Sequence, residues 1–457
     1  MAEQPSLAMF SDRVLLPEGL GPAVVHVQGA RIERVEAVSA CPPGALDLSG
    51  HLVAPSFVNA HTHLPMSAFR ALGGVAGRAN NVIEDVWFAV ESRMTAADVR
   101  AFTRVAALEV LLGGTGAVFE HYYHGEALAQ AFVDVGLTGV IAPTVQDLSG
   151  PGVPQRAAQI EATLAIHHDA ELAAKGIRSM WGPHATDTVS EEVFRELLAL
   201  PAELPVHVHV AQSIEELRRA RRGGRTPIEA LGDAGVLERP ALLVHALFVS
   251  ASDRERLDPE RHVLGHCPWS QTQFAWPAHL DPWLDAGFAV AVGTDAGACN
   301  DTMNVQQELR LMATGPMYQV ATHETTYALL GNDDAAEGLA ARRRHAFQRT
   351  ARQADPLWLL STVGTAPGRL VPELGLGEIR AGALANIAVW DLQHPALWPA
   401  RDPLRALTFG DATPALHSLL VAGRWIGEVG DVRSLLRQEV VRDWVREATE
   451  RLEALLP

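Results

Sequence analysis

The chain has 457 residues, too many for one ordinary hydrophobic core but suitable for a large barrel with a smaller module. Hydrophobic residues make up 48% of the chain and charged residues 20%, as in a compact globular protein. The formal net charge of −17 argues against a nucleic-acid surface, because no positive field would attract phosphates.

Targeting and membrane segments are not apparent in the sequence. The N-terminus lacks the basic start and apolar core of a secretory signal, and no stretch approaches the ~20 apolar residues that span a bilayer. Cys41, Cys267 and Cys299 are an odd number of cysteines spaced far apart, which does not suit a disulfide framework. We therefore expect a cytoplasmic protein without a membrane or nucleic-acid partner.

Short β-strands separated by turns are predicted at both ends of the chain. The expected strands are 7–16, 23–28, 31–38 and 46–53 near the start, and 385–390 and 419–426 near the end. They indicate one small composite β-sandwich made of residues 1–55 and 366–430. Apolar residues recur at helical spacing in the tail, so residues 431–457 are predicted to form a closing C-terminal helix.

The middle of the chain, residues 56–365, alternates predicted strands with helices. The eight strand candidates are 52–61, 116–121, 137–144, 177–183, 205–210, 241–247, 262–267 and 288–294. Such alternation indicates a parallel sheet, and eight units favour a closed barrel over an open doubly wound sheet. No Gly-rich phosphate-binding turn follows an early strand. The predicted fold class is α/β, a (β/α)8 TIM barrel with a small β-sandwich.

Potential metal ligands stand at the carboxyl ends of these strands, the face where such barrels build active sites. The first strand leads into His61 and His63, the fifth carries His207 and His209, and the last ends at Asp295. Residues two apart on a strand share a face, so His61 and His63 can hold one ion together. We favour His209 over His207 because it lies nearer the barrel mouth. Nitrogen and carboxylate donors suit zinc, with iron, manganese or cobalt as alternatives.

Four segments in this order resemble the amidohydrolase superfamily: PSFVNAHTHLPMS, PVHVHVAQSIEE, LLVHALFVS and GTDAGACND. More narrowly, they are similar to its branch of methylthioadenosine/S-adenosylhomocysteine deaminases, guanine deaminases and triazine chlorohydrolases. The resemblance covers nearly the whole chain. It implies a metal-dependent hydrolase that uses an activated water on a C–N bond of a planar nitrogen heterocycle or amidine, most simply as a deaminase. A small-molecule substrate is implied, and a homodimer is compatible with the resemblance.

The resemblance also implies roles for individual residues. His61, His63, His209 and Asp295 would bind the metal, and Asp295 would in addition accept a proton from the attacking water. His245 would polarise the group at the reacting carbon. Together these residues supply the proton acceptor and the electrophile that hydrolysis of a C–N bond at neutral pH requires.

One ion is expected, because the only lysine in the chain, Lys175, precedes the fourth strand and cannot end it as a bridging ligand would. Gln212, a third candidate catalytic residue, stands where deaminases of this branch carry a glutamate that protonates a ring nitrogen. An amide donates a hydrogen bond but does not shuttle a proton. This favours an alternative reaction: opening of a cyclic amide, or displacement of chloride, thiolate or amine from an activated ring. Glu215 or Glu216 is the alternative proton donor.

Three further residues are candidate substrate contacts. His184 follows the fourth strand, where the resemblance to nucleoside deaminases places a substrate-binding histidine. Trp87 can stack on a planar ring or simply pack, and Arg70 can pair with a substrate carboxylate or lie on a solvated helix face. His121 and His124, after the second strand, are interpreted as supporting residues.

The alternative from another class of function is a barrel that has lost catalysis and serves as a binding or scaffold protein. Relatives of that kind lose metal ligands, whereas the ligand set is complete here. Substrate specificity is expected in the βα segments 65–96 and 306–339.

Overall fold

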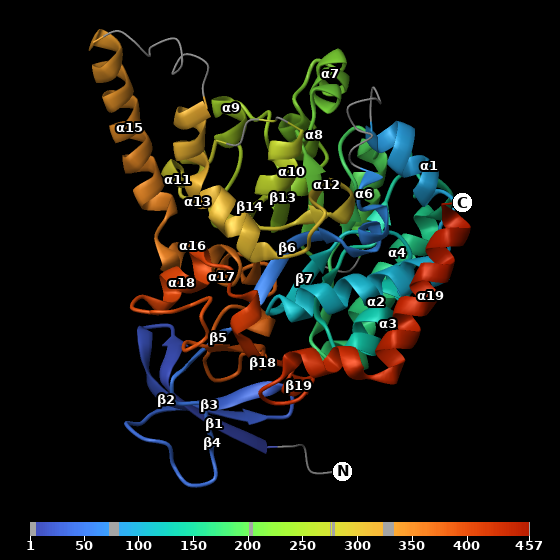
Figure 1. Ribbon diagram of the computed structural model, residues 1–457. Helices are drawn as coiled ribbons and strands as arrows, with labels where there is room; N and C mark the ends of the chain where they lie inside the picture. The colour runs from blue at the N-terminus through green and yellow to red at the C-terminus, as the bar shows by residue number, and fades with distance from the viewer. Residues whose placement is uncertain are drawn as a thin grey trace.

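The computed structural model describes residues 6–72, 82–200, 204–274, 276, 279–322 and 333–456. Residues 73–81 and 323–332, which belong to the two segments expected to carry specificity, lie outside the described residues. None of the helices in the described part of the chain combines the length and apolar character that a membrane crossing requires. Figure 1 shows strands at the centre, helices around them, and a separate sheet below.

Eight strand units form the barrel, and they correspond to the eight predicted strands. They are β6 (Phe57–His63), β7 (Thr115–Glu120), β8 (Thr138–Ile141) with β9 (Thr144–Val145), β10 (Ile177–Ser179) with β11 (Gly182–Pro183), β12 (Val206–Val210), β13 (Ala241–His245), β14 (His262–His266), and β15 (Ala289–Val292) with β16 (Asp295–Ala296). Parallel pairing runs from β16 through β6, β7 and β8 to β10, and from β12 to β15. Parallel bridges Trp181–Val206 and Ala185–His209 join these two arcs, which confirms the predicted barrel.

The barrel strands are buried over nearly their whole length. In β13 the sequence ALLVH is buried at every position, and VHVHV in β12 is as well. This pattern belongs to parallel strands covered on both faces, whereas a strand with one wet face alternates. The histidines are therefore carried on buried strands, near their carboxyl ends.

Helices follow the strands and cover the barrel (Figure 1). The longer ones are α2 (Ala96–Leu112), α3 (Gly125–Val135), α4 (Arg156–His168), α6 (Glu191–Ala199), α7 (Ile214–Arg222), α13 (Val305–Thr322) and α15 (Asp333–Gln353). Helix α2 begins at a capping box in which Thr95 and Asp98 satisfy each other's backbone amides. The short helix α10 (Pro268–Gln273) follows β14 and contributes to the site described below.

Strands from both chain ends form one further sheet. It comprises β1 (Ser6–Leu16), β2 (Gly19–Gln28), β3 (Arg31–Ala37), β4 (Leu46–Asp47), β5 (His51–Pro55), β17 (Ile387–Asp391), β18 (Leu416–Val421) and β19 (Arg424–Ile426). The two ends meet where β17 pairs antiparallel with β5. The tail forms α19 (Glu439–Leu455), which lies along α2, where Arg104 donates to Glu447 at 2.6 Å (Figure 1).

Candidate active site

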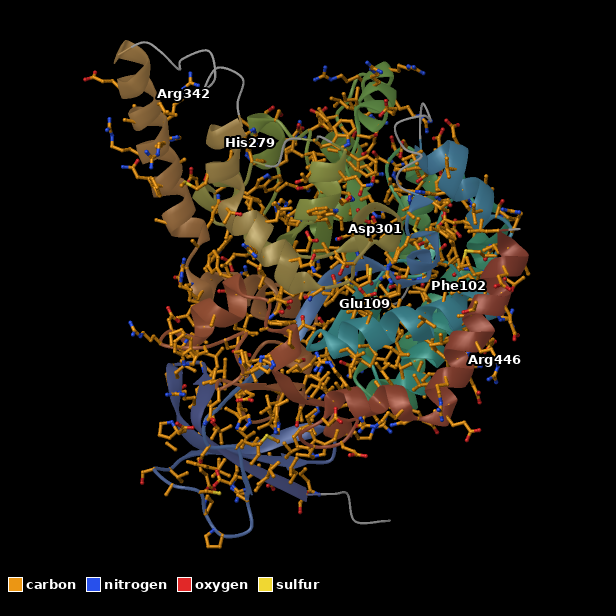
Figure 2. The ribbon with its side chains drawn as sticks, viewed as in Figure 1. Phe102, Glu109, His279, Asp301, Arg342 and Arg446 are labelled. Atoms are coloured by element: carbon orange, nitrogen blue, oxygen red, sulfur yellow. The ribbon has the colours of Figure 1, made fainter. Side chains whose placement is uncertain are left out.

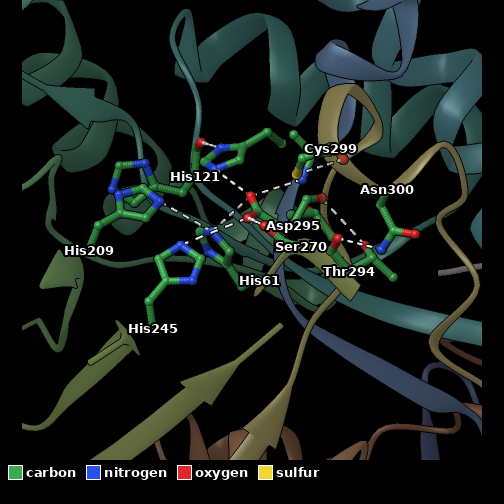
Figure 3. A network of polar contacts seen from close by, with 12 residues as sticks. His61, His121, His209, His245, Ser270, Thr294, Asp295, Cys299 and Asn300 are labelled. Carbon is green, nitrogen blue, oxygen red and sulfur yellow. Dashed lines mark hydrogen bonds and ion pairs between the residues drawn. The ribbon is translucent and has the colours of Figure 1, made fainter. Parts of the chain in front are cut away.

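Imidazoles and one carboxylate converge at the carboxyl end of the barrel (Figure 3). The Nε2 atoms of His61 and His209 lie 3.2 Å apart, and Asp295 Oδ1 lies 3.7 Å from Nε2 of His61 and 3.4 Å from Nε2 of His63. Ligand atoms of His61, His63 and Asp295 all lie within 4.8 Å of one another, and so do those of His61, His209 and His245. The structure thus brings together the four residues predicted as ligands, with His245 beside them.

Hydrogen bonds on the far side of two rings determine which nitrogen faces the cluster. Nδ1 of His63 donates to the backbone carbonyl of His121, and Nδ1 of His209 donates to that of His184 at 2.8 Å. Because a carbonyl only accepts, the neutral ring must carry its proton on Nδ1 and its lone pair on Nε2. Metal-ligating histidines are oriented in this way, so both rings present a free donor atom to a common point.

His207 lies behind the cluster and supports His61. Its Nε2 is 2.8 Å from Nδ1 of His61, and both side chains are fully buried. His61 therefore also directs Nε2 toward Asp295. This position favours His209 over His207 as the ligand, in agreement with the sequence-based preference.

The electrostatics of the cluster fit a divalent cation. Burial lowers the pKa of His61 to about 3 and lowers the pKa of His63 and His209 as well, because a desolvated imidazolium is unfavourable. Burial opposes ionisation of Asp295, but the surrounding imidazoles of His61, His245 and His63 favour the carboxylate form and leave its pKa lowered. Neutral imidazoles and an ionised carboxylate are the forms that coordinate metal.

Two features hold the last strand against the first. Asn59 Nδ2 donates to Thr294 Oγ1 at 2.7 Å, and the Thr294 amide donates to Asn59 Oδ1 at 3.0 Å. Gly293 has no room for a side chain, because a Cβ there would lie 2.6 Å from the backbone nitrogen of His61. Asp295 follows with φ of 61°, a strained conformation typical of functional sites. His61 and Asp295 are thereby fixed next to each other.

A buried carboxyl group holds the turn that carries His63. Glu120, at the end of β7, accepts from Thr62 Oγ1 at 2.6 Å and from the Leu64 amide at 3.0 Å. Burial raises the pKa of Glu120 to about 8, although these two hydrogen bonds oppose the rise. Residues on either side of His63 are thus tied to the neighbouring strand.

A cavity of about 250 Å³ adjoins the cluster, and His63, His209, His245 and Asp295 line it. Most of its wall is apolar. The aromatic residues in the lining are Trp87, Phe88, Tyr122, Tyr123, Phe274 and Trp276. Glu91 and Glu215 also line it, whereas no lysine or arginine does in the described part of the chain.

The structure places most of the other predicted site residues at this cavity. Trp87, His184, Gln212 and His245 all line it, and Nε2 of His245 lies 3.8 Å from Asp295 Oδ2. The backbone amide of Gln212 donates to Glu216 Oε2 at 2.8 Å. Glu216 is fully buried away from the lining, so Glu215 is the one of the two alternative acids that faces the cavity.

Arg70 is not brought to the cavity. Its exposed guanidinium forms an ion pair with Glu109 of α2, which Figure 2 labels on the flank of the barrel. The predicted contact with a substrate carboxylate is therefore not supported. The local sequence could not predict this ion pair, because the direction of the Arg70 side chain depends on how the turn after β6 packs against α2.

Several polar residues of the cavity were missed or undervalued at the sequence level. His121, interpreted only as a supporting residue, lines the cavity, and its Nδ1 lies 2.8 Å from Thr144 Oγ1. Glu91 is 6% exposed, and burial raises its pKa to about 7. Ser270 donates to Asp295 Oδ2 at 2.7 Å, and Gln271 follows it in the lining. For Glu91 a signal existed, since Trp87 stands four residues before it and shares its helix face.

A (β/α)8 barrel with histidine and aspartate donors at its carboxyl end is the architecture of a metal-dependent hydrolase. The chain belongs to the amidohydrolase family, whose sequence model matches residues 52–328. It is accordingly a hydrolase that acts on C–N bonds other than peptide bonds. The family resemblance seen in the sequence motifs is confirmed.

Similar proteins are found over nearly the whole chain. A 5-methylthioadenosine/S-adenosylhomocysteine deaminase of Natronomonas pharaonis is 29% identical over 411 residues, covering 89% of this chain and 88% of the relative. A zinc-bound adenosine deaminase from Xanthomonas campestris has a TM-score of 0.78 at 21% identity over 98% of both chains. Atrazine chlorohydrolase from Arthrobacter aurescens, complexed with zinc, has a TM-score of 0.76 at 20% identity, covering 99% of this chain and 100% of that one. The two structures confirm the fold.

We expect the purified protein to carry about one equivalent of divalent metal. The predicted ligands form a single cluster, and Lys175 lies at the end of a helix with Nζ 4.0 Å from Glu171, where it cannot bridge a second ion. Elemental analysis measures the stoichiometry. A value near two equivalents would contradict the single-ion prediction.

We expect His245→Ala to retain metal while losing most activity. His61, His63, His209 and Asp295 remain as donors, and His245 is placed to act on the substrate from the same cavity wall. Metal content and kcat measured on the same preparation separate the two roles. Loss of metal from this variant would instead make His245 a ligand.

Proposed function

We propose that this protein is an aminohydrolase that releases ammonia from a planar nitrogen heterocycle or a related amidine. One divalent ion, zinc in the first instance, is held by His61, His63, His209 and Asp295. The observation that carries the proposal is that these donors converge beside a cavity lined by aromatic side chains. The relative named for methylthioadenosine and S-adenosylhomocysteine deamination supports an amino-substituted ring as the substrate.

The residues around Asp295 prepare it to accept a proton. When bound, the divalent ion acts as a Lewis acid and lowers the pKa of a water molecule toward ~7. Asp295 is oriented by Ser270, which donates to Oδ2 at 2.7 Å, and by the Ala296 amide, which donates to Oδ1 at 2.9 Å. Its lowered pKa keeps it ionised and able to take the proton of the attacking water. His245, on the Oδ2 side of Asp295, stabilises charge at the reacting carbon.

The cavity wall favours a neutral, flat molecule. Trp87 and Phe274 contact each other at 6.2 Å between ring centroids, and an aromatic wall of this kind stacks on a planar ring. The described lining holds Glu91 and Glu215 but no lysine or arginine, so nothing there matches an anionic substituent. A neutral heterocycle fits better than one with a carboxylate or phosphate tail.

A second candidate reaction does not need a protonated ring nitrogen. It is the opening of a cyclic amide, or the displacement of chloride, thiolate or amine from an activated ring. Gln212 favours it, because this side chain lines the cavity and an amide does not deliver a proton. Glu91 favours deamination instead, since it is a cavity acid whose burial raises its pKa to about 7.

We further propose that the enzyme works in the cytoplasm and without a nucleic-acid partner. Cys41, Cys267 and Cys299 are all free thiols, as expected in a reducing compartment. The net charge of −17 disfavours contact with phosphate backbones. Its partner is then a small-molecule substrate.

We expect Asp295→Asn to lower kcat by roughly 10²–10⁴, the range of general-base assistance. Three histidines remain as ligands, so the metal content should change less than the rate. Steady-state kinetics and elemental analysis of the same preparation check this. A variant that keeps its metal and loses less than about tenfold in kcat would refute the role of Asp295 as base.

The two candidate reactions are separated by assaying ammonia release from adenosine, guanine, aminotriazines and cyclic amides. We expect the wild type to release ammonia from at least one amino heterocycle. Gln212→Glu should impair that reaction, because the amide hydrogen bond is worth about 0.5–1.5 kcal/mol, yet increase weak deamination of purines. Products without ammonia would establish the second candidate. Efficient purine deamination by the wild type would show that Gln212 is no obstacle to this chemistry.

A further inference from the structure

Gln271 is a buried amide without a hydrogen-bond partner. It lies in α10, lines the active-site cavity and is only 2% exposed. Neither its Nε2 nor its Oε1 is paired, and among the described buried side chains it is the one amide for which both ends are unpaired. Its backbone groups are satisfied, since its amide donates to Cys267 at 3.1 Å and its carbonyl accepts from Trp276 at 2.9 Å. The deficit is therefore confined to the side chain.

An unpaired buried amide is costly. Native proteins pair most buried polar atoms, because an unsatisfied one has lost its hydrogen bonds to water without gaining a partner. Gln306 shows the ordinary situation in this chain, because it is equally buried at 2% exposure and its Nε2 donates to Leu407 O at 3.1 Å while its Oε1 accepts from Thr413. An apolar residue would be the more stable choice at position 271 unless something in the cavity pairs with the amide.

The helix that carries Gln271 is firmly held. Glu308 accepts from the Trp269 amide at 2.8 Å and from Asn300 Nδ2 at 2.7 Å, and Ser270 donates to Asp295 at 2.7 Å. The residue immediately before Gln271 thus contacts the proposed base. Gln271 therefore lies at a fixed position in the cavity lining, next to the reacting centre.

The amide offers a donor and an acceptor side by side. A glutamine side chain can form two hydrogen bonds with a heterocycle edge on which a ring nitrogen stands next to an N–H group, as it does with adenine. It cannot do so with an edge that is fully alkylated or halogenated. Such a pairing would satisfy both orphaned atoms at once.

We propose that Gln271 determines the substrate class of this site by forming hydrogen bonds with a ring nitrogen and an adjacent N–H group. Nε2 donates to the ring nitrogen, and Oε1 accepts from the N–H. The substrate is then an aminated azine or a ring lactam with this edge unsubstituted. The inference rests on the proposed function only in taking the occupant to be a planar nitrogen heterocycle.

The test compares two symmetric probes, melamine and hexamethylmelamine. Every edge of melamine has a ring nitrogen beside N–H groups, whereas hexamethylmelamine keeps the ring nitrogens and has no N–H. Dissociation constants are measured by calorimetry on the metal-loaded wild type and on Gln271→Met, with Gln271→Leu as a second apolar variant. We expect the wild type to prefer melamine. Loss of two hydrogen bonds should weaken melamine binding about 5- to 150-fold. Hexamethylmelamine, which can accept only the bond from Nε2 to a ring nitrogen, should lose clearly less.

Gln306→Met is the matched control, and the unfolding midpoint is the second measurement. Replacing Gln271 removes an unsatisfied group, so the midpoint should stay or rise, whereas Gln306→Met breaks made hydrogen bonds and should lower it while retaining the preference for melamine. A lowered midpoint with unchanged probe selectivity in Gln271→Met, or a wild type that does not prefer melamine, overturns the inference.

Failure of the proposed function gives a different result. If no heterocycle releases ammonia but the preference for melamine depends on Gln271, the proposed reaction is wrong and the proposed role of Gln271 is supported. If ammonia is released and the preference does not depend on Gln271, the reaction stands and the recognition is wrong.

Discussion

The site depends on the close approach of the last barrel strand to the first. Gly293 permits it, since any Cβ there would overlap the backbone of His61, and the paired hydrogen bonds of Asn59 and Thr294 hold it. Asp295 comes directly after this contact and is kept at a positive φ. The contact that closes the barrel therefore also brings Asp295 next to His61.

Burial makes the cluster chemically usable. Away from water the imidazoles remain neutral. Their Nδ1–H groups donate hydrogen bonds to backbone carbonyls or to His207. Asp295 alone stays ionised, because its neighbours stabilise its charge against the effect of burial. The same exclusion of water strengthens every polar interaction in the cavity. A hydrogen bond between a substrate and the unpaired amide of Gln271 would therefore discriminate between substrates more strongly than one at the surface.

The barrel and its metal face could be predicted because both leave local signals. Continuous apolar runs of strand length alternate with helices, and HTH, VHVH and TD stand where the runs end. A strand's period of two places His61 and His63 on one face without any knowledge of the fold. That period does not separate His209 from His207; His209 was preferred because it lies nearer the barrel mouth, and the hydrogen bond between His207 and His61 supports this preference.

The sequence by itself determined the order of strands and helices, the family, and the residues that can ligate a metal, because these depend on neighbours along the chain. Tertiary structure decided which polar groups meet. In the folded chain Arg70 forms an ion pair with Glu109, and Asn59 forms a hydrogen bond with Thr294. Glu91 and Gln271 line the cavity. Such pairings link residues far apart in sequence, and their energy depends on which atoms lose water together when the chain folds.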